Sequence, residues 1–156
     1  MKKVILAVAV AVLVSSLSFG QWQESFYVDE FGEKTEDSFM YIISNDGTFS
    51  NSATQNSKLK CQFMLNDDSL SIKVYEYGRS LATGSEGTFE KVKIKTPSDE
   101  IVEIKKVFFS KGGFLYFSKK NFIKVNETLK EKGDYMMIFN KSSSYSNSSY
   151  KIKFTI

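Results

Sequence analysis

Apolar and polar residues alternate most regularly between Lys58 and Tyr77. In residues 58–65 the odd positions are apolar and the even positions mostly polar, and alternation returns after the Asn-Asp-Asp-Ser stretch at 66–69. Successive residues of a β-strand face opposite sides of a sheet, so each run has a core side and a solvent side. Asx side chains support turns through local hydrogen bonds. We therefore predict a β-hairpin here, at the centre of an antiparallel core.

Similar runs predict the remaining strands. Asn45-Asp46-Gly47 is predicted to be a tight turn, because Asp-Gly suits backbone positions with positive φ. The stretches 107–109 and 114–117 are apolar at both odd and even positions, which indicates strands covered on both faces. The predicted strands lie at 21–30, 38–44, 48–50, 88–96, 100–110, 114–118, 134–141 and 150–156.

Residues 121–132 break the β pattern. Apolar residues recur at i, i+3 and i+7 from Phe122, which is a helical stripe. Asn121 suits the N-cap and Gly133 the C′ position. We predict a short helix that covers one end of the β core, with a partner-binding helix as the alternative. The fold predicted from strand spacing is all-β: an antiparallel β-sandwich or flattened barrel of about eight to ten strands with this one helix.

The first 20 residues are typical of a secretory signal peptide. Two lysines follow the initiator methionine, residues 4–14 are apolar, and Ser18 and Gly20 suit the positions before a cleavage site. The apolar run is shorter than the roughly 20 residues of a spanning helix, although an uncleaved anchor is the alternative. No cysteine follows the cut, so the sequence does not support a lipid-modified N-terminus. Residues 21–156 then form a single exported domain without an integral membrane span, located in the periplasm or secreted.

Composition excludes several kinds of chemistry. After signal removal, 19 Lys and Arg face 18 Asp and Glu, so bulk charge gives nucleic-acid binding no help and we expect no nucleic acid as partner. The chain has no histidine, which excludes Ser-His-Asp and Cys-His machinery. Cys61 is the only cysteine, so an internal disulfide is excluded. Its phase with Leu59 and Phe63 predicts a buried residue, with an exposed thiol or an intermolecular bridge as the alternative.

Paired carboxylates are the remaining catalytic candidates. Asp29 and Glu30 point to opposite faces of a predicted strand, whereas Glu36-Asp37 and Asp67-Asp68 lie in predicted turns. A glycosidase needs two carboxylates about 5 to 10 Å apart in a cleft, and nothing in the sequence indicates that pairing. No calcium-loop, phosphate-loop or dinucleotide motif is present. We therefore predict a non-enzymatic protein without cofactor or metal.

Two loops supply the candidate contact residues. Residues 142–149 combine small hydroxyls with Tyr145 and Asn147, a composition suited to adaptable polar contacts, although a floppy hairpin tip is the alternative. Residues 78–87 contain three glycines together with Arg79. Arg79, Tyr145 and Asn147 are the predicted binding residues.

Lysines also mark one phase of two predicted strands, at 91, 93 and 95 and at 151 and 153. Such faces suit anionic glycans, lipid headgroups or an acidic partner. The alternative is a solvated outer face, where lysine also protects strand edges from pairing with other chains.

The layout of residues 57–156 resembles small exported bacterial β-sandwich proteins. The stretches SKLKCQFM and SLSIKVYEYG are followed by a lysine-rich strand, FIKVNETLKEKG, DYMMIFNK and YKIKFTI. This order is similar to the accessory-protein group of type VI secretion systems and to the invasion-associated locus B group. The resemblance implies a bacterial envelope or secreted protein with a binding or structural role, and it carries over no catalytic residues. A second cysteine is lacking, which sets the chain apart from disulfide-linked versions of that fold.

These observations predict an exported, non-catalytic interaction or structural module that binds a protein or envelope component. One alternative is a β-barrel that holds a small apolar or amphipathic ligand among the aromatic residues of 107–117 and 135–139. A second alternative is a carboxylate-based hydrolase.

Overall fold

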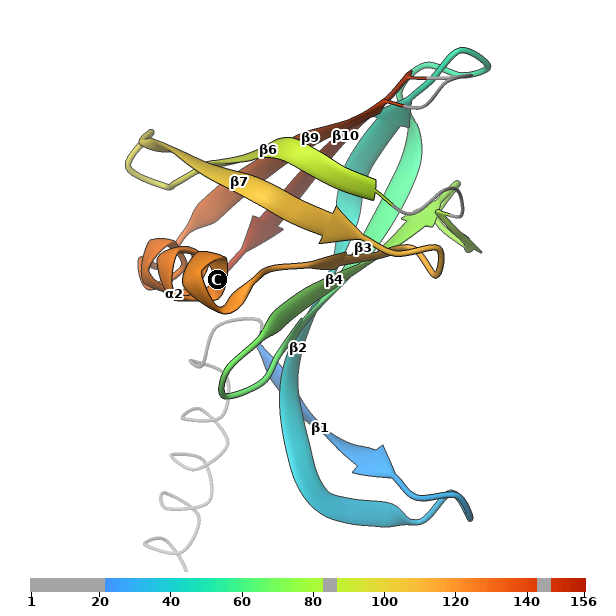
Figure 1. The fold of residues 1–156 in the computed structure, drawn as a ribbon, viewed down its shortest axis with the longest axis vertical. Coiled ribbons are helices and arrows are strands. Elements are labelled where there is room, and N and C mark those ends of the chain that lie inside the picture. The colour runs from blue at the N-terminus through green and yellow to red at the C-terminus, as the bar shows by residue number, and fades with distance from the viewer. Residues whose placement is uncertain (1–21, 83–86, 143–146) are drawn as a thin grey trace, which may run out of the picture.

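The computed structural model describes residues 22–82, 87–142 and 147–156, which form a closed antiparallel β-barrel with one helix (Figure 1). The elements are β1 (Gln23–Val28), β2 (Lys34–Ser50), β3 (Ser57–Leu65), β4 (Leu70–Glu76), β5 (Ser80–Leu81), β6 (Gly87–Lys95), β7 (Ile101–Phe109), β8 (Phe114–Tyr116), α2 (Lys119–Thr128), β9 (Asp134–Ser142) and β10 (Asn147–Thr155). Neighbouring strands follow the order β2-β10-β9-β6-β7-β8-β4-β3, and β3 pairs back with β2 to close the ring. The predicted all-β fold is confirmed, and it takes the form of a barrel.

The central hairpin is confirmed. β3 and β4 form antiparallel pairs that begin at the turn with Leu65 opposite Leu70 and end with Leu59 opposite Glu76. The predicted turn is present, because the backbone N of Asn66 donates to the Ser69 carbonyl oxygen at 2.9 Å. Cys61 lies on the inner face of β3 with 1% exposure, and burial raises the pKa of its thiol. The alternation therefore selects the core side of both strands.

Stacked aromatic rings fill part of the barrel interior. Phe139 stacks on Tyr150 with ring centroids 4.9 Å apart, and Tyr135 stacks on Phe154 at 5.3 Å. The Tyr150 hydroxyl donates to Glu76 Oε1 at 2.8 Å, which satisfies the phenol inside the core. Eight strands enclose a space just wide enough for such side chains or for one small ligand.

β2 runs without interruption from Lys34 to Ser50, so the predicted turn at Asn45-Asp46-Gly47 is wrong. The register of β2 against β3 shifts between Ser44 and Gly47, which makes this segment a bulge within the strand. A Cβ on Gly47 would lie 3.1 Å from the carbonyl oxygens of both Leu59 and Lys151. Glycine is needed here for the close approach of β3, β2 and β10, not for a turn.

The predicted helix exists, but α2 spans Lys119 to Thr128 rather than 121–132. Ser118, not Asn121, is the N-cap, because Ser118 Oγ accepts from the backbone N of Asn121 at 3.4 Å. The Asn121 side chain instead donates to the Lys105 carbonyl oxygen of β7 at 2.7 Å. A serine three residues upstream therefore sets the start of the helix.

α2 packs against the barrel core through the predicted stripe, with Phe122 and Val125 buried. Gly133 lies beyond the helix C-cap, Leu129, so its predicted C′ role is wrong. It pairs instead with Ile156 through two backbone hydrogen bonds of 2.9 and 3.1 Å. Within the described part of the chain, no helix combines the length and the apolar character that a membrane crossing needs.

The first part of β2 leaves the barrel and forms a two-stranded ribbon with β1 (Figure 1). Lys34, Ser38 and Phe39 pair with β1 and with no other described strand, whereas Met40 and Tyr41 also pair with β3. The predicted strands at 21–30 and 38–44 left residues 31–37 as a connecting loop, but pairing already begins at Lys34, opposite Val28. The ribbon of residues 23–41, whose base at Met40 and Tyr41 is paired with β3, is referred to below as the arm.

Candidate binding surfaces

The residues predicted to bind a partner do not form one site in the described structure. Arg79 is exposed in the turn from β4 to β5, where its backbone N donates to the Glu76 carbonyl oxygen at 3.2 Å. Asn147 begins β10 and lines a hollow of about 360 Å³ with asparagine, glutamine and serine side chains, which Arg79 does not join. Tyr145 lies outside the described residues.

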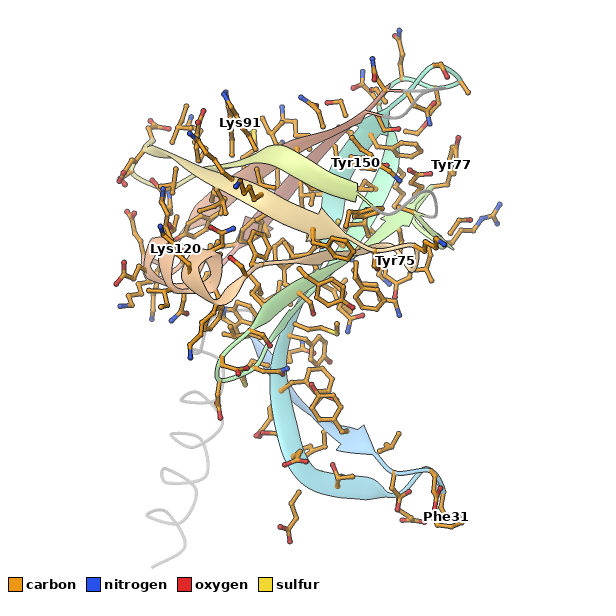
Figure 2. The ribbon with its side chains drawn as sticks, in the orientation of Figure 1. Phe31, Tyr75, Tyr77, Lys91, Lys120 and Tyr150 are labelled. Atoms are coloured by element: carbon orange, nitrogen blue, oxygen red, sulfur yellow. The ribbon has the colours of Figure 1, made fainter. Side chains whose placement is uncertain are left out.

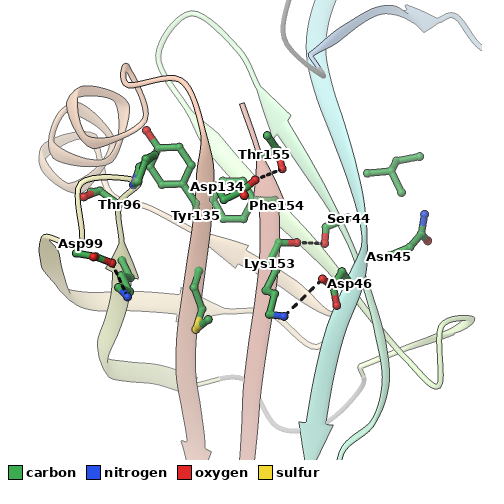
Figure 3. Close-up of a pocket in the computed structure, with 14 residues that line it drawn as sticks. Ser44, Asn45, Asp46, Thr96, Asp99, Asp134, Tyr135, Lys153, Phe154 and Thr155 are labelled. Atoms are coloured by element: carbon green, nitrogen blue, oxygen red, sulfur yellow. Dashed lines mark hydrogen bonds and ion pairs between the residues drawn. The ribbon is translucent and has the colours of Figure 1, made fainter.

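A larger polar groove of about 790 Å³ lies between β2, the 96–99 turn, β9 and β10 (Figure 3). Lys95 Nζ lies 2.6 Å from Asp99 Oδ1, and Lys153 Nζ lies 3.8 Å from Asp46 Oδ2. The third carboxylate, Asp134 at the start of β9, accepts a hydrogen bond of 2.6 Å at its Oδ1 from Thr155 Oγ1. Each of the three groove carboxylates thus has a neighbouring partner.

Lys95 sets the charge state of one groove carboxylate. The hydrogen bond and the charge of Lys95 lower the pKa of Asp99, so this carboxyl stays ionised where a general acid would need a raised pKa. Among the described residues, no group of three or more His, Cys, Asp or Glu side chains is arranged to hold a metal ion. The groove contacts join β10 to β2 and to β9, whereas the Lys95–Asp99 pair lies within the end of β6 and its own turn.

Four aromatic side chains form a second surface, on the outside of the barrel wall. Phe108 of β7 lies opposite Tyr116 of β8, with ring centroids 6.4 Å apart, and Tyr116 stacks on Phe114 at 5.8 Å. Tyr75 lies on the outer face of the adjacent β4 (Figure 2). Phe108 is 42% and Tyr116 43% exposed, so this row of rings is open to solvent.

Two lysines flank these rings. Lys73 lies opposite Phe114 in the register, with its Nζ 5.2 Å from the Phe114 ring centroid and 5.5 Å from that of Tyr75. Lys60 lies opposite Tyr75 in the register, with its Nζ 5.7 Å from the Tyr75 ring centroid. At these distances the cation–π attraction favours ammonium groups that stay beside the rings. The two lysines and four aromatic residues are referred to as the platform: Lys60, Lys73, Tyr75, Phe108, Phe114 and Tyr116.

The prediction that 107–109 and 114–117 are covered on both faces is wrong. Leu115 is fully buried inside the barrel, but its neighbours on the other phase face solvent. The sequence held a signal for this. The outer phase of these two short stretches holds only aromatic residues, Phe108, Phe114 and Tyr116, and lysines lie on the neighbouring strands at Lys60 and Lys73.

The tip of the arm is a hydrogen-bonded turn that presents a phenylalanine. Asp29 Oδ1 accepts from the backbone N of Phe31 and of Glu33, each at 2.9 Å. This Asx arrangement is a standard way to stabilise a turn. Phe31 is 81% exposed and Val28 63% exposed, so the ordered tip leaves apolar surface in water (Figure 2).

Side chains on the two faces of the arm pack along the ribbon. On one face the Tyr27 and Phe39 ring centroids lie 4.9 Å apart, and Phe39 and Tyr41 lie 6.3 Å apart. On the other face Lys34 Nζ lies 3.2 Å from the Phe26 ring centroid. These cross-strand contacts stabilise the ribbon.

Charge is strongly separated between the arm and the barrel. Residues 23–41 contain six acidic residues and one lysine, whereas residues 42–156 contain 18 Lys and Arg and 12 Asp and Glu. The near-neutral total therefore conceals an acidic arm on a basic barrel. None of the six acids forms an ion pair with another described residue: Glu24, Asp29, Glu30, Glu33, Glu36 and Asp37.

Comparisons with known protein families, with curated proteins and with solved structures give no match. The layout resemblance to exported β-sandwich proteins stays a prediction. The functional argument therefore rests on the geometry of the arm, the platform and the groove.

Proposed function

We propose that this protein is an exported, non-catalytic interaction module of the bacterial envelope or secreted fraction, and that the arm is its binding element. The single observation that carries the proposal is the arm itself. It is an ordered ribbon whose apolar tip, with Phe31 81% exposed, packs on no other part of the described chain. Large exposed apolar groups on a projecting element are typical of interaction sites.

The edge of the arm supports the same proposal. β1 is the terminal strand of the sheet order, so its outer edge has no strand partner among the described residues. A free edge is a template for pairing with another chain, and proteins usually protect it. β1 itself carries one acidic side chain, Glu24, and Asp29 and Glu30 follow it at the tip. These charges discourage indiscriminate pairing and favour a partner with basic groups.

The alternatives have less support. Inside the barrel, Phe139 and Tyr135 stack on neighbouring rings, and Tyr150 bonds to Glu76. The interior aromatic residues are therefore engaged with each other, which favours a packed core over a site for a small apolar ligand. For the hydrolase, Lys95 lowers the pKa of Asp99, which is the opposite of what a general acid needs, and Asp46 lies beside Lys153.

Site-specific photo-crosslinking tests the proposal. A benzophenone amino acid replaces Phe31 in the full chain, which is produced and processed in the cell that makes it. A matched variant carries the same group at Ile123 of α2, which is 53% exposed but lies off the arm. We expect ultraviolet light to give a discrete protein adduct from the position 31 variant and none from the position 123 variant.

Two outcomes would overturn the proposal. One is the absence of an adduct at position 31, and the other is the same set of adducts at both positions. Cell fractionation and the intact mass of the recovered protein test the export part. We expect the chain in an exported fraction with Gln21 as its first residue.

A further inference from the structure

We infer that the arm of one copy binds the platform of a second copy of this chain. The inference rests on the proposed function and deepens it, because it names the partner of the arm. It follows from the opposite chemistry of two exposed surfaces on the same molecule.

Charge complementarity is the first argument. The arm has a net formal charge of −5, whereas the outward positions of β3, β4 and β8 hold lysines and no acidic side chain. Lys60 and Lys73 form no ion pair with a described residue. Glu30, Glu33 and Glu36 of the arm are exposed and equally unpaired. Seating the arm on the platform brings these unpaired groups of opposite sign together.

Matching aromatic surfaces are the second argument. Phe31 projects from the arm tip between acidic neighbours. The platform offers the exposed rings of Phe108 and Tyr116, and its two lysines lie to one side of these rings, beside Phe114 and Tyr75. An aromatic anchor that enters a desolvated centre within a polar rim is the usual arrangement of an interface hot spot. Ring pairs contribute about 0.5–1.5 kcal/mol beyond the area they bury.

The arm does not bind the platform of its own chain. No hydrogen bond, ion pair or ring contact joins the described residues of the two surfaces. The Tyr27 hydroxyl instead donates to Asn66 Oδ1 at 3.2 Å, which ties the arm to the β3–β4 turn. At about 3.3 Å per residue, the paired part of the arm is about 25 Å long, enough to reach a neighbouring molecule.

The size of the two surfaces also fits. Specific interfaces use about 20–30 residues from each partner. The 19 residues of the arm and the six of the platform together set an upper limit of about 25 from each copy. A reciprocal pair, in which each copy seats its arm on the other, uses both surfaces and closes on itself.

A charge-swap experiment tests this inference in the full exported chain. Lys60→Glu with Lys73→Glu reverses the platform, and Glu30→Lys with Glu33→Lys and Glu36→Lys reverses the arm. Molar mass is followed by sedimentation over a series of protein concentrations. We expect the wild type to self-associate, and each variant alone to associate at least about tenfold more weakly, because like charges then face each other.

Mixing the two variants gives the sharpest result. An acidic platform then meets a basic arm, and an acidic arm meets a basic platform, so both contacts are restored in the mixed pair. We expect the equimolar mixture to regain the wild-type association. Raising the salt concentration from about 0.1 M to about 1 M shortens the electrostatic screening length from about 10 Å to about 3 Å. We expect this change to weaken the association of the mixed pair.

A matched variant controls for charge alone. Lys91→Glu with Lys151→Glu makes the same change of charge on the outer faces of β6 and β10, away from the platform, and should associate as the wild type does. Circular dichroism and thermal unfolding check that all variants fold. A monomeric wild type, or folded variants whose mixture stays monomeric, overturns the inference.

The two proposals fail in different ways. A discrete adduct from the benzophenone at position 31 with a different protein, together with a monomeric wild type, supports the interaction module and excludes the second copy as its partner. An adduct with twice the mass of this chain supports both.

Discussion

Adjacent phenylalanines at positions 108 and 109 have opposite environments, with exposures of 42% and 1%. Strand geometry places Phe109 in the core and Phe108 among the platform rings. Hydrophobicity alone does not separate the two residues, because an apolar side chain is compatible with either face. Only the neighbours across the strands, a ring at Tyr116 and ammonium groups beyond it, show that the outer position is an aromatic surface.

Gly47 gives the sharpest prediction at the residue scale. In Gly47→Ala the new Cβ would lie 3.1 Å from Leu59 Cβ, from the Leu59 carbonyl oxygen and from the Lys151 carbonyl oxygen. Two of these atoms are backbone, so the strands must move apart. We expect a loss of about 1–3 kcal/mol in the free energy of unfolding, the usual range for overpacking, measured by urea titration.

Gly87→Ala is the matched control, because it lies at the start of β6 and a Cβ there meets no atom within 4 Å. Its free energy of unfolding should change by no more than about 0.5 kcal/mol. Equal stability of the two variants would show that the strands are not closely packed at Gly47.

The helix shows that a sequence pattern can predict the right type of element with the wrong boundaries. The stripe from Phe122 to Leu129 predicted a helix, and α2 is present. Both Asn121 and Ser118 are residues that cap helices, and the sequence does not rank them. The choice depends on β7, because the Lys105 carbonyl oxygen accepts from the Asn121 amide and so holds that side chain away from the helix terminus.

The capping role of Ser118 is open to a direct test. Ser118→Ala removes the oxygen that accepts from the Asn121 backbone N, and should lower the free energy of unfolding by about 0.5–2 kcal/mol. Ser118→Asp restores an acceptor and places a negative charge at the helix N-terminus, so it should retain wild-type stability. Urea titration of both variants checks this, and wild-type stability in Ser118→Ala would exclude the cap.

At the scale of the whole molecule, one chain contains two parts of unequal stability. The barrel closes on itself and encloses the hydrophobic core, whereas the arm is a ribbon of two strands. Isolated two-stranded hairpins are marginally stable in water. The arm therefore gains its order from the root at β3, from the Tyr27–Asn66 hydrogen bond and from cross-strand contacts.

Hydrogen exchange should reveal this division. At high salt, where contact between copies is weakest, we expect the amides of residues 24–28 and 34–39 to exchange far faster than those of β3 and β4. The difference should narrow at low salt and high protein concentration, where the arm is seated. Equal protection of arm and barrel at high salt would mean that the two unfold as one unit.

The sequence by itself determined which residues of β3, β4 and β10 face the core, that one helix interrupts the strands, and that histidine-based chemistry and an internal disulfide are excluded. These properties follow from local alternation and from composition. Only the tertiary structure shows where strand pairing begins and ends. β2 continues through Gly47 as one strand and extends into the arm, and pairing of β2 with β3 closes the barrel. It also brought Lys60, Lys73 and the rings into one platform and set the acidic residues apart from it. Alternation assigns a face to each residue but does not say which strands become neighbours, because that depends on contacts between residues distant in the chain.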